Sequence, residues 1–359
     1  MKGLNIYQRK DGRFEGRIIT EIIDGKRKFK AFFGKTAEEV MNKMDNYRAS
    51  QLVQITERPS FSDVFTEWLH SISYRIKEST RANYLLKANK HILPAFGNEN
   101  ISEISQYSVC NFISDKQNSG LSNRYIIDIL ILMKAVFKYA ARTYHIFNPM
   151  DGLAMPKKEK TEVLLLTPEQ EKKLMRILLS NPTLTNAGIV LARMTGLRIG
   201  ELCALQWKDI DLEKRILTVS KTIQRIQAKG GVKKTKLIIT EPKSETSKRN
   251  IPIPECIIEL FCQFQGKAEE YVLSGTEKPI EPRTIQYRFA AILKNGNLPS
   301  VHFHALRHMF ATSCVKLGFD IKTLSEILGH SGVEITLNRY VHSSFEQKTE
   351  YMDRLKVAI

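Results

Sequence analysis

The spacing of apolar and turn-forming residues changes along this chain from strand-like to helical, with one later strand-like segment, and this pattern sets the fold class. Two Asp-Gly pairs, Asp11-Gly12 and Asp24-Gly25, separate three runs rich in β-branched and aromatic residues, and such pairs are typical of two-residue hairpin turns. The predicted strands are Leu4 to Arg9, Phe14 to Ile23 and Lys26 to Phe33. Thr36 then opens a capping box that predicts a helix. Residues 1–56 are therefore predicted to form a small three-stranded sheet followed by one helix.

After this module the apolar residues follow helical spacing as far as about residue 155. Serines precede the apolar runs that begin after Ser60 and Ser122, as expected at helix starts. Pro156 and the charged residues after it predict an interdomain linker. We therefore predict an all-helical second domain.

Helical patterns resume at Thr167, where a proline occupies the first helical position. A β segment with a Gly-Gly turn interrupts them between Ile216 and Ile253, and the remainder is again helical. The predicted fold class is multidomain α+β, with a mostly helical third domain that contains a β-hairpin sheet. The predicted domains are residues 1–56, 57–156 and 161–359.

The chain is strongly basic, with a formal net charge of +17 over 359 residues. This charge predicts a polyanionic partner, with nucleic acid as the leading candidate and an anionic membrane surface as the competitor. The stretch Lys214 to Asn250 holds eleven Lys and Arg residues against two Glu residues. Its candidate DNA-binding residues are Lys233, Lys234, Lys236 and Arg249. A solvated charged hairpin is the alternative.

The predicted N-terminal strands carry basic residues interleaved with aromatic ones. Strand alternation predicts that the aromatic residues face a core and that much of the basic set faces outward. A three-stranded sheet can lie in the major groove and contact base edges, whereas the alternative is a solvated sheet face. The candidate DNA-binding residues are Arg9, Arg13, Arg17, Lys26, Arg27, Lys28 and Lys30.

Several classes of protein find no support in the sequence. The longest apolar run, Ile126 to Phe137, is interrupted by Asp128 and Lys134 and is too short to span a bilayer. The N-terminus offers no apolar signal-peptide core. Five cysteines without CxxC spacing support neither a disulfide framework nor a zinc site. We therefore expect reduced thiols in a cytosolic protein that does not engage a membrane.

The C-terminal part of the chain carries the residue types that metal-free phosphodiester cleavage requires. That chemistry needs a nucleophile, cations that stabilise the transition state, and a proton for the leaving oxygen. His304 and Arg307 share one face of a predicted helix, and His330 and Tyr340 follow. Arg198 lies far upstream in a turn flanked by glycines. Each of these residues taken alone could have a structural role instead of a catalytic one. An isolated histidine or tyrosine usually packs in a core, and the glycine before His330 can simply end a helix.

Taken in order, these segments strongly resemble the catalytic motifs of the tyrosine recombinase (phage integrase) family. The motifs are Thr195 to Leu202, His304 to His308, Leu328 to Ser331 and Thr336 to Tyr340. Between the first two, Glu241 to Ser244 and Arg249 to Pro252 resemble the family's β-hairpin with its catalytic lysine.

The resemblance extends over essentially the whole chain. It implies that residues 57–156 bind core DNA sites and that residues 1–56 form an arm-site-binding domain. This domain resembles that of integrases from conjugative transposons and Gram-positive temperate phages. Residues 161–359 are then the catalytic domain.

The resemblance also implies a role for each residue in the proton and bond changes. Tyr340 attacks the scissile phosphate and becomes a 3′-phosphotyrosine, which leaves a free 5′ hydroxyl. His304 assists proton transfer at the tyrosine, and Lys243 protonates the leaving oxygen. Lys236 and Lys248, which lie on the same basic hairpin, are alternatives for that acid.

Four further residues are implied to bind or support the phosphate. Arg198 and Arg307 hold its non-bridging oxygens, and His330 hydrogen-bonds to it. Glu201 is a supporting acid that orients the site. No cofactor and no metal ion are implied, because the phosphotyrosine conserves the bond energy.

The function implied is that of a site-specific integrase, which inserts and excises a mobile element, by transposition or viral genome integration, through a Holliday junction. The implied partners are double-stranded DNA with core and arm sites, three further copies of the chain in a tetramer, an excisionase and a DNA-bending protein, in the cytoplasm of a bacterial host. One alternative is another tyrosine-based enzyme, such as a chromosome or plasmid resolvase or a type IB-like topoisomerase. The other is a non-catalytic DNA-binding regulator of the same fold.

Overall fold

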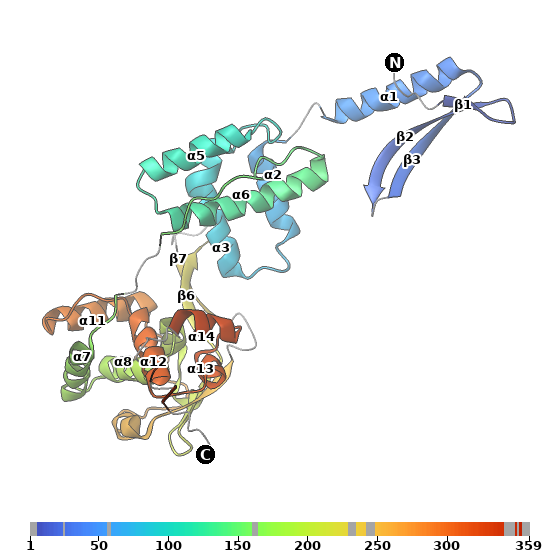
Figure 1. The fold of residues 1–359 in the computed structure, drawn as a ribbon. Coiled ribbons are helices and arrows are strands. Elements are labelled where there is room, and N and C mark those ends of the chain that lie inside the picture. The colour runs from blue at the N-terminus through green and yellow to red at the C-terminus, as the bar shows by residue number, and fades with distance from the viewer. Residues whose placement is uncertain are drawn as a thin grey trace. The chain divides into compact units, whose positions relative to one another are not determined.

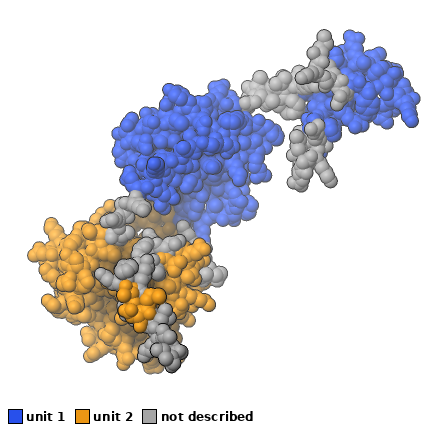
Figure 2. Space-filling view, in the orientation of Figure 1, with its two compact units in different colours: residues 1–159 blue, residues 160–359 orange. Residues whose placement is uncertain are grey.

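The structure is a computed structural model. It describes residues 6–23, 26–55, 59–159, 164–228, 235–241, 248–340, 349 and 352–353, without the side chains of 20–23, 26–27, 48–55 and 338–340. Residues 1–159 and 160–359 form two compact units (Figure 2). The boundary between them falls in the predicted linker after Pro156. The division into three domains stays a prediction.

The N-terminal residues form the predicted sheet and helix (Figure 1). The strands β1 (Ile6–Gln8), β2 (Phe14–Ile23) and β3 (Lys26–Gly34) pair antiparallel in the order β1-β2-β3, and helix α1 (Ala37–Ile55) follows. One face of the sheet packs against α1. A Cβ atom on Gly16 of β2 would lie 2.3 Å from the Met44 Sδ atom and 2.8 Å from the Val40 Cγ1 atom of α1, so only glycine permits this approach.

The other face of this sheet carries aromatic and basic side chains together. Tyr7, Phe29 and Phe33 are exposed, while the Arg17 guanidinium lies 5.6 Å from the Tyr7 ring centroid and the Arg9 guanidinium 5.6 Å from that of Phe33. The prediction that alternation separates aromatic from basic residues is therefore wrong. Helix α1 packs on the opposite face, and within the described residues guanidinium groups pack against the rings of this face.

The next part of the chain is helical, as predicted. Its elements are α2 (Phe61–Ser71), α3 (Glu78–Lys87), the π-helical turn η1 (Ala88–Ile92), α4 (Leu93–Phe96), α5 (Gln106–Asn118) and α6 (Asn123–Tyr144). The Ser60 and Ser122 side chains cap α2 and α6 by accepting backbone N–H bonds. The long helix α6 buries its apolar stripe, with Ile126, Leu130 and Phe137 at the centre of the core.

The second unit combines helices with two small sheets. Its helical elements are α7 (Pro168–Ser180), α8 (Leu184–Thr195), α9 (Ile199–Ala204), η2 (Trp207–Asp209), η4 (Glu255–Ile257), α10 (Ile258–Cys262), α11 (Pro282–Asn295), α12 (His304–Lys316), α13 (Ile321–Leu328) and α14 (Val333–Tyr340). One sheet has the order β4-β5-β8, and the other is the pair β6-β7. The strands are β4 (Ile210–Asp211), β5 (Ile216–Val219), β6 (Thr222–Gln227), β7 (Thr235–Thr240) and β8 (Arg249–Pro252). The mixed α+β fold and the hairpin sheet are as predicted.

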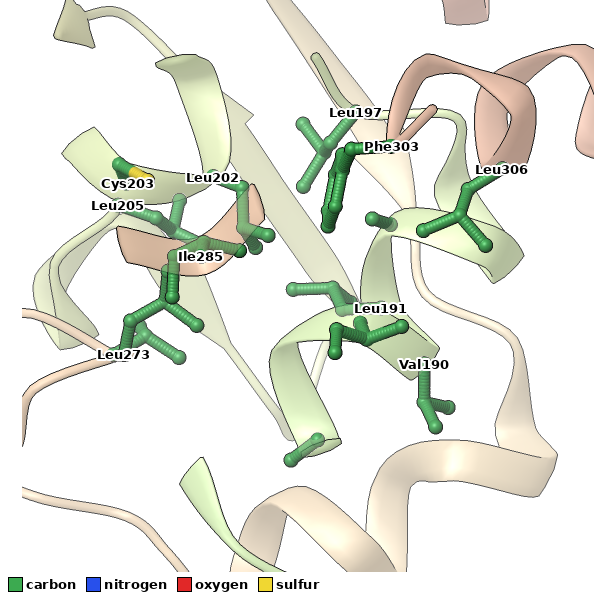
Figure 3. Close-up of a cluster of buried hydrophobic side chains, with 14 of the residues drawn as sticks. Val190, Leu191, Leu197, Leu202, Cys203, Leu205, Leu273, Ile285, Phe303 and Leu306 are labelled. Atoms are coloured by element: carbon green, nitrogen blue, oxygen red, sulfur yellow. The ribbon is translucent and has the colours of Figure 1, made fainter. Parts of the chain in front are cut away.

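Helices and strands both contribute to the core of this unit, part of which is drawn in Figure 3. Leu191 of α8, Leu202 of α9, Ile285 of α11 and Leu306 of α12 are all buried there. This packing fixes the ends of α8 and α12, which carry the predicted catalytic motifs. Across the described residues of both units, none of the helices is both long and apolar enough to cross a membrane.

Candidate active site

The turn between α8 and α9 places Arg198. Helix α8 ends at Gly196, whose φ of 69° is in the left-handed region, and a Cβ atom there would lie 2.5 Å from the Phe310 Cδ1 atom. The turn therefore requires glycine. Arg198 is the N-cap residue of α9, and its backbone N–H donates to the Glu201 Oε2 atom at 3.0 Å. Its side chain is 37% exposed.

Arg307, on α12, lies deeper in the same region and is only 2% exposed. Its Nη1 atom donates to the Gly196 carbonyl at 2.8 Å and its Nη2 atom to the Leu328 carbonyl at 2.7 Å. Arg198 Nη2 donates to the next carbonyl, that of Gly329, at 3.0 Å. The two predicted catalytic arginines, which are separated by more than a hundred residues of sequence, therefore meet at the C-terminal end of α13.

Glu201 is the anion of this cluster. Its side chain is 4% exposed and contacts two guanidinium groups, with Oε1 2.8 Å from Arg198 Nη1 and Oε2 2.9 Å from Arg249 Nη2. Burial by itself raises the pKa of Glu201, but the charges and hydrogen bonds of Arg249 and Arg198 outweigh it, and the pKa is lowered. The carboxylate is therefore ionised and can hold Arg198 in a fixed orientation.

His330 is oriented from α14. It follows Gly329, whose φ of 63° ends α13, and its Nδ1 atom lies 2.7 Å from the Thr336 Oγ1 atom. Thr336 is buried on α14, the helix that Tyr340 ends. Sequence reasoning missed Thr336 as a partner, since its only signal is its position four residues before the tyrosine.

His304 is the first residue of α12 and is exposed. Its ring lies 4.8 Å from that of the buried His308, centroid to centroid, in an edge-to-face arrangement. His304 and Arg307 thus share the N-terminal turn of one helix. Within the described residues, no cluster of three or more His, Cys, Asp or Glu side chains is arranged to hold a metal ion.

Some predicted residues lie outside the described part of the structure. These are Lys233, Lys234 and Lys243, together with the side chains of Lys26, Arg27 and Tyr340. Lys236 is exposed on β7, where it pairs with Ile226 of β6. The structure thus brings together Arg198, Glu201, Arg307 and His330, and the placement of Lys243 and the Tyr340 hydroxyl stays a prediction.

Arg249 was predicted to bind DNA, but the structure places its side chain in the interior. It is 6% exposed, and Nε donates to the Ile327 carbonyl at 2.6 Å while Nη2 contacts Glu201. This location favours a role inside the protein over a contact with phosphate. Beside it, an open depression of about 340 Å³ is lined by residues of β8, α13 and the start of α14. The lining residues are Lys248, Arg249, Lys322, Ser325, Glu326, His330, Gly332 and Val333.

The described basic residues of the N-terminal sheet are spread over different surfaces. Arg9 and Arg17 lie together on the open face, where both contact the buried Glu15 carboxylate, at 2.9 and 2.6 Å. Lys30 instead lies 4.1 Å from the Tyr47 ring centroid on α1. Arg13 pairs with Asp11 near the first turn, and Lys28 is exposed on β3.

Comparison with known proteins identifies the family. The model of the phage integrase family matches residues 165–347, and a phage integrase N-terminal SAM-like domain matches residues 60–117. The first match alone covers just over half of the chain. The chain therefore belongs to the phage integrase family, as its motifs predicted.

Relatives along the full length agree. The chain is 29% identical to the tyrosine recombinase XerC-like protein of Caldanaerobacter subterraneus over 92% of each chain, and 24% identical to the ICEBs1 integrase of Bacillus subtilis over 89% of each. The solved Tn1549 transposon integrase, in complex with a circular intermediate DNA, is 25% identical, with a TM-score of 0.68 over 83% of this chain and 99% of that one. The chain is accordingly a site-specific tyrosine recombinase that cleaves and rejoins DNA to integrate and excise a mobile element.

Proposed function

We propose that this recombinase cleaves DNA with Tyr340 and holds the scissile phosphate between Arg198 and Arg307. The observation that supports the proposal is the convergence of both arginines on adjacent carbonyls at the end of α13, directly before His330. A pentavalent phosphorus transition state carries extra negative charge, and guanidinium groups match its oxygens with paired donors.

The two arginines approach that phosphate differently. Arg198 is partly exposed and can meet it from solvent. Arg307 is buried, and each of its terminal nitrogens donates to a carbonyl; because a terminal guanidinium nitrogen carries two N–H groups, these bonds do not by themselves prevent a contact with a phosphate oxygen. His330, which is held by Thr336, donates the remaining hydrogen bond.

The bond changes in this proposal balance. The Tyr340 oxygen bonds to phosphorus and gives its proton toward His304, while the bond to the 5′ oxygen breaks and that oxygen takes a proton from Lys243. Attack by a 5′ hydroxyl on the phosphotyrosine reverses these changes and rejoins the strand. The bond energy is conserved throughout, so the residues of the chain suffice without a nucleotide or a metal ion.

The other parts of the chain are proposed to recognise DNA. Residues 57–156 bind the core site, and residues 1–56 bind arm sites through the open sheet face. Support for the latter comes from Arg9 and Arg17, which are held side by side by Glu15 and packed against aromatic rings. Guanidinium groups fixed in this way can contact base edges or phosphates in a groove.

The proposed assembly is a tetramer on two DNA sites in the bacterial cytoplasm. Exchange between two duplexes cuts four strands, and each protomer supplies one tyrosine, so four protomers complete the reaction through a Holliday junction. An excisionase and a DNA-bending protein are the proposed accessory partners. A resolvase would need no arm-binding module, and a non-catalytic regulator would need no Arg198–Glu201–Arg307 cluster.

Trapping of a covalent adduct tests this proposal. A core-site duplex with a nick close to the cleavage point loses a short fragment after cleavage, so the strand cannot be rejoined and the protein stays attached. The wild-type chain is expected to give an adduct that survives denaturing electrophoresis, and Tyr340→Phe none. Tyr287→Phe, which changes an exposed tyrosine on α11, is the matched control for loss of a tyrosine hydroxyl. An adduct formed by Tyr340→Phe would overturn the assignment.

A further inference from the structure

Three consecutive carbonyl groups at the C-terminal end of α13 each accept a hydrogen bond from a different arginine. Arg249 donates to Ile327 at 2.6 Å, Arg307 to Leu328 at 2.7 Å and Arg198 to Gly329 at 3.0 Å. The last carbonyls of a helix lack intrahelical partners and carry partial negative charge. This helix end therefore sets the positions of all three guanidinium groups relative to one another.

Arg249 is also joined to Arg198 by a second route. Its Nη2 atom contacts the Glu201 Oε2 atom at 2.9 Å, and Glu201 in turn contacts Arg198 through Oε1 at 2.8 Å. Arg249 thus links Glu201, the carboxylate that orients Arg198, to the C-terminal end of α13. Arg198 contacts the same helix end through the Gly329 carbonyl. A lysine has one compact ammonium group and cannot make both contacts with the same fork geometry.

The packing around Arg249 leaves it little freedom. Its side chain is 6% exposed. A Cβ atom built on Gly329 would lie 3.0 Å from both its Cδ and Nη1 atoms, so the stem of Arg249 runs directly over the glycine that precedes His330. Arg249 also begins β8, where it pairs with Val219 of β5.

We propose that Arg249 is a positioning residue for catalysis: it fixes Glu201 against the end of α13, so that Arg198 faces the scissile phosphate in one orientation. This inference rests on the proposed function. Arg249 acts through Arg198 and makes no contact with DNA. This positioning role takes the place of the DNA contact that the basic hairpin sequence predicted for Arg249.

Two consequences separate this role from a structural one. First, loss of Arg249 should matter less when the scissile phosphate is a methylphosphonate. That group is uncharged, so its transition state depends less on a well-placed Arg198. Second, loss of Arg249 should leave the salt dependence of DNA binding unchanged, whereas loss of a phosphate contact lowers the slope by about one.

The experiment compares Arg249→Met and Arg249→Lys in the full chain with wild type on the nicked core duplex, with either a phosphate or a methylphosphonate at the cleavage point. We expect Arg249→Met to slow adduct formation about 100-fold on phosphate, as a misplaced catalytic group does, and less than about 10-fold on methylphosphonate. Arg198→Ala should show the same pattern, and Arg249→Lys an intermediate one.

Arg193→Met is the matched structural control. Arg193 is also a buried arginine paired with a glutamate, Glu171, and it lies outside the network at α13. Arg193→Met should slow adduct formation by the same factor on the phosphate and the methylphosphonate substrate. The positioning role is overturned by any of three results for Arg249→Met: adduct formation as fast as in wild type, slowing by the same factor on both substrates, or a salt dependence of DNA binding whose slope is lower by one. If the wild-type chain forms no adduct, the proposed function fails, and the inference fails with it.

Discussion

Replacing Glu201 with glutamine tests how much the arginine cluster depends on one buried carboxylate. The two carboxylate oxygens accept four donors: Arg198 Nη1 and Arg249 Nη1 on Oε1, at 2.8 and 3.2 Å, and the Arg198 backbone N–H and Arg249 Nη2 on Oε2, at 3.0 and 2.9 Å. A glutamine keeps one acceptor and turns a donating NH₂ group toward the other pair. It also removes the negative charge that Arg249, 6% exposed, contacts.

The expected cost is about 3 kcal/mol, at the lower end for removing one partner of a buried ion pair. The Arg198–Glu201 pair is counted as a small part of this free energy, because solvent screens the Arg198 side chain, which is 37% exposed. With a urea dependence of about 3 kcal/mol per molar for a unit of this size, the unfolding midpoint should fall by roughly 1 M.

The chain offers a specific probe for this measurement. It has two tryptophans, and Trp207 is buried in the second unit while Trp68 lies in the helical part of the first. In a Trp68→Phe background, Trp207 fluorescence therefore reports unfolding of the second unit alone. Glu269→Gln, which removes the exposed pair with Lys208, is the control and should leave the midpoint nearly unchanged.

The pH dependence has a definite sign. The pKa of Glu201 is lowered in the folded state, so its contribution is complete above the unfolded-state pKa of about 4.3 and is lost as the pH falls through the folded value. The difference in unfolding midpoint between wild type and Glu201→Gln should therefore become smaller in acid. If Glu201→Gln shifts the unfolding midpoint at neutral pH no more than the Glu269→Gln control does, Glu201 contributes no more than an exposed ion pair and the prediction is wrong.

Three further predictions address other parts of the chain. Lys243→Ala should slow cleavage of ordinary DNA but much less so when the bridging 5′ oxygen is sulfur, a leaving group that needs no proton; equal losses in timed adduct assays would move the acid role to Lys236 or Lys248. Deleting residues 1–56 should abolish recombination between full attachment sites while short core duplexes are still cleaved, and unchanged recombination would remove the arm-binding role. Burial, followed by the charges of Lys116 and Lys90, lowers the pKa of His91, so the helical part should lose stability as the pH falls below about 6.5, where the unfolded chain takes up the proton first. Unfolding followed by Trp68 fluorescence in a Trp207→Phe background should show this loss and its absence in His91→Phe, and the same slope in both proteins would contradict it.

Features set by local sequence were predicted well. The Asp-Gly pairs marked the hairpins, and Ser60 and Ser122 marked helix starts, because turn and cap preferences act over only a few residues. The spacing of His304 and Arg307 gave their shared helix for the same reason. The family emerged from the order of the motifs, which needs no geometry.

Features that depend on distant partners were not predictable. Arg249 looked like one more cation of a basic hairpin, and its burial depends on Glu201, 48 residues earlier, and on Ile327, 78 residues later. In the N-terminal sheet, alternation indicated two faces but not that Phe33 would lie beside Arg9 on the face opposite α1. The covered face is the one on which α1 packs, where Gly16 lies against Val40 and Met44.

Formation of a 3′-phosphotyrosine at Tyr340 can be tested by identifying the residue and the DNA end that are joined in the trapped adduct. Protease digestion followed by mass spectrometry should find the nucleotide on the peptide that contains Tyr340. End-labelling should show a free 5′ hydroxyl on the released fragment. A nucleotide on any other residue, or a protein joined to the 5′ end of the DNA, would rule out Tyr340 as the nucleophile that forms a 3′-phosphotyrosine.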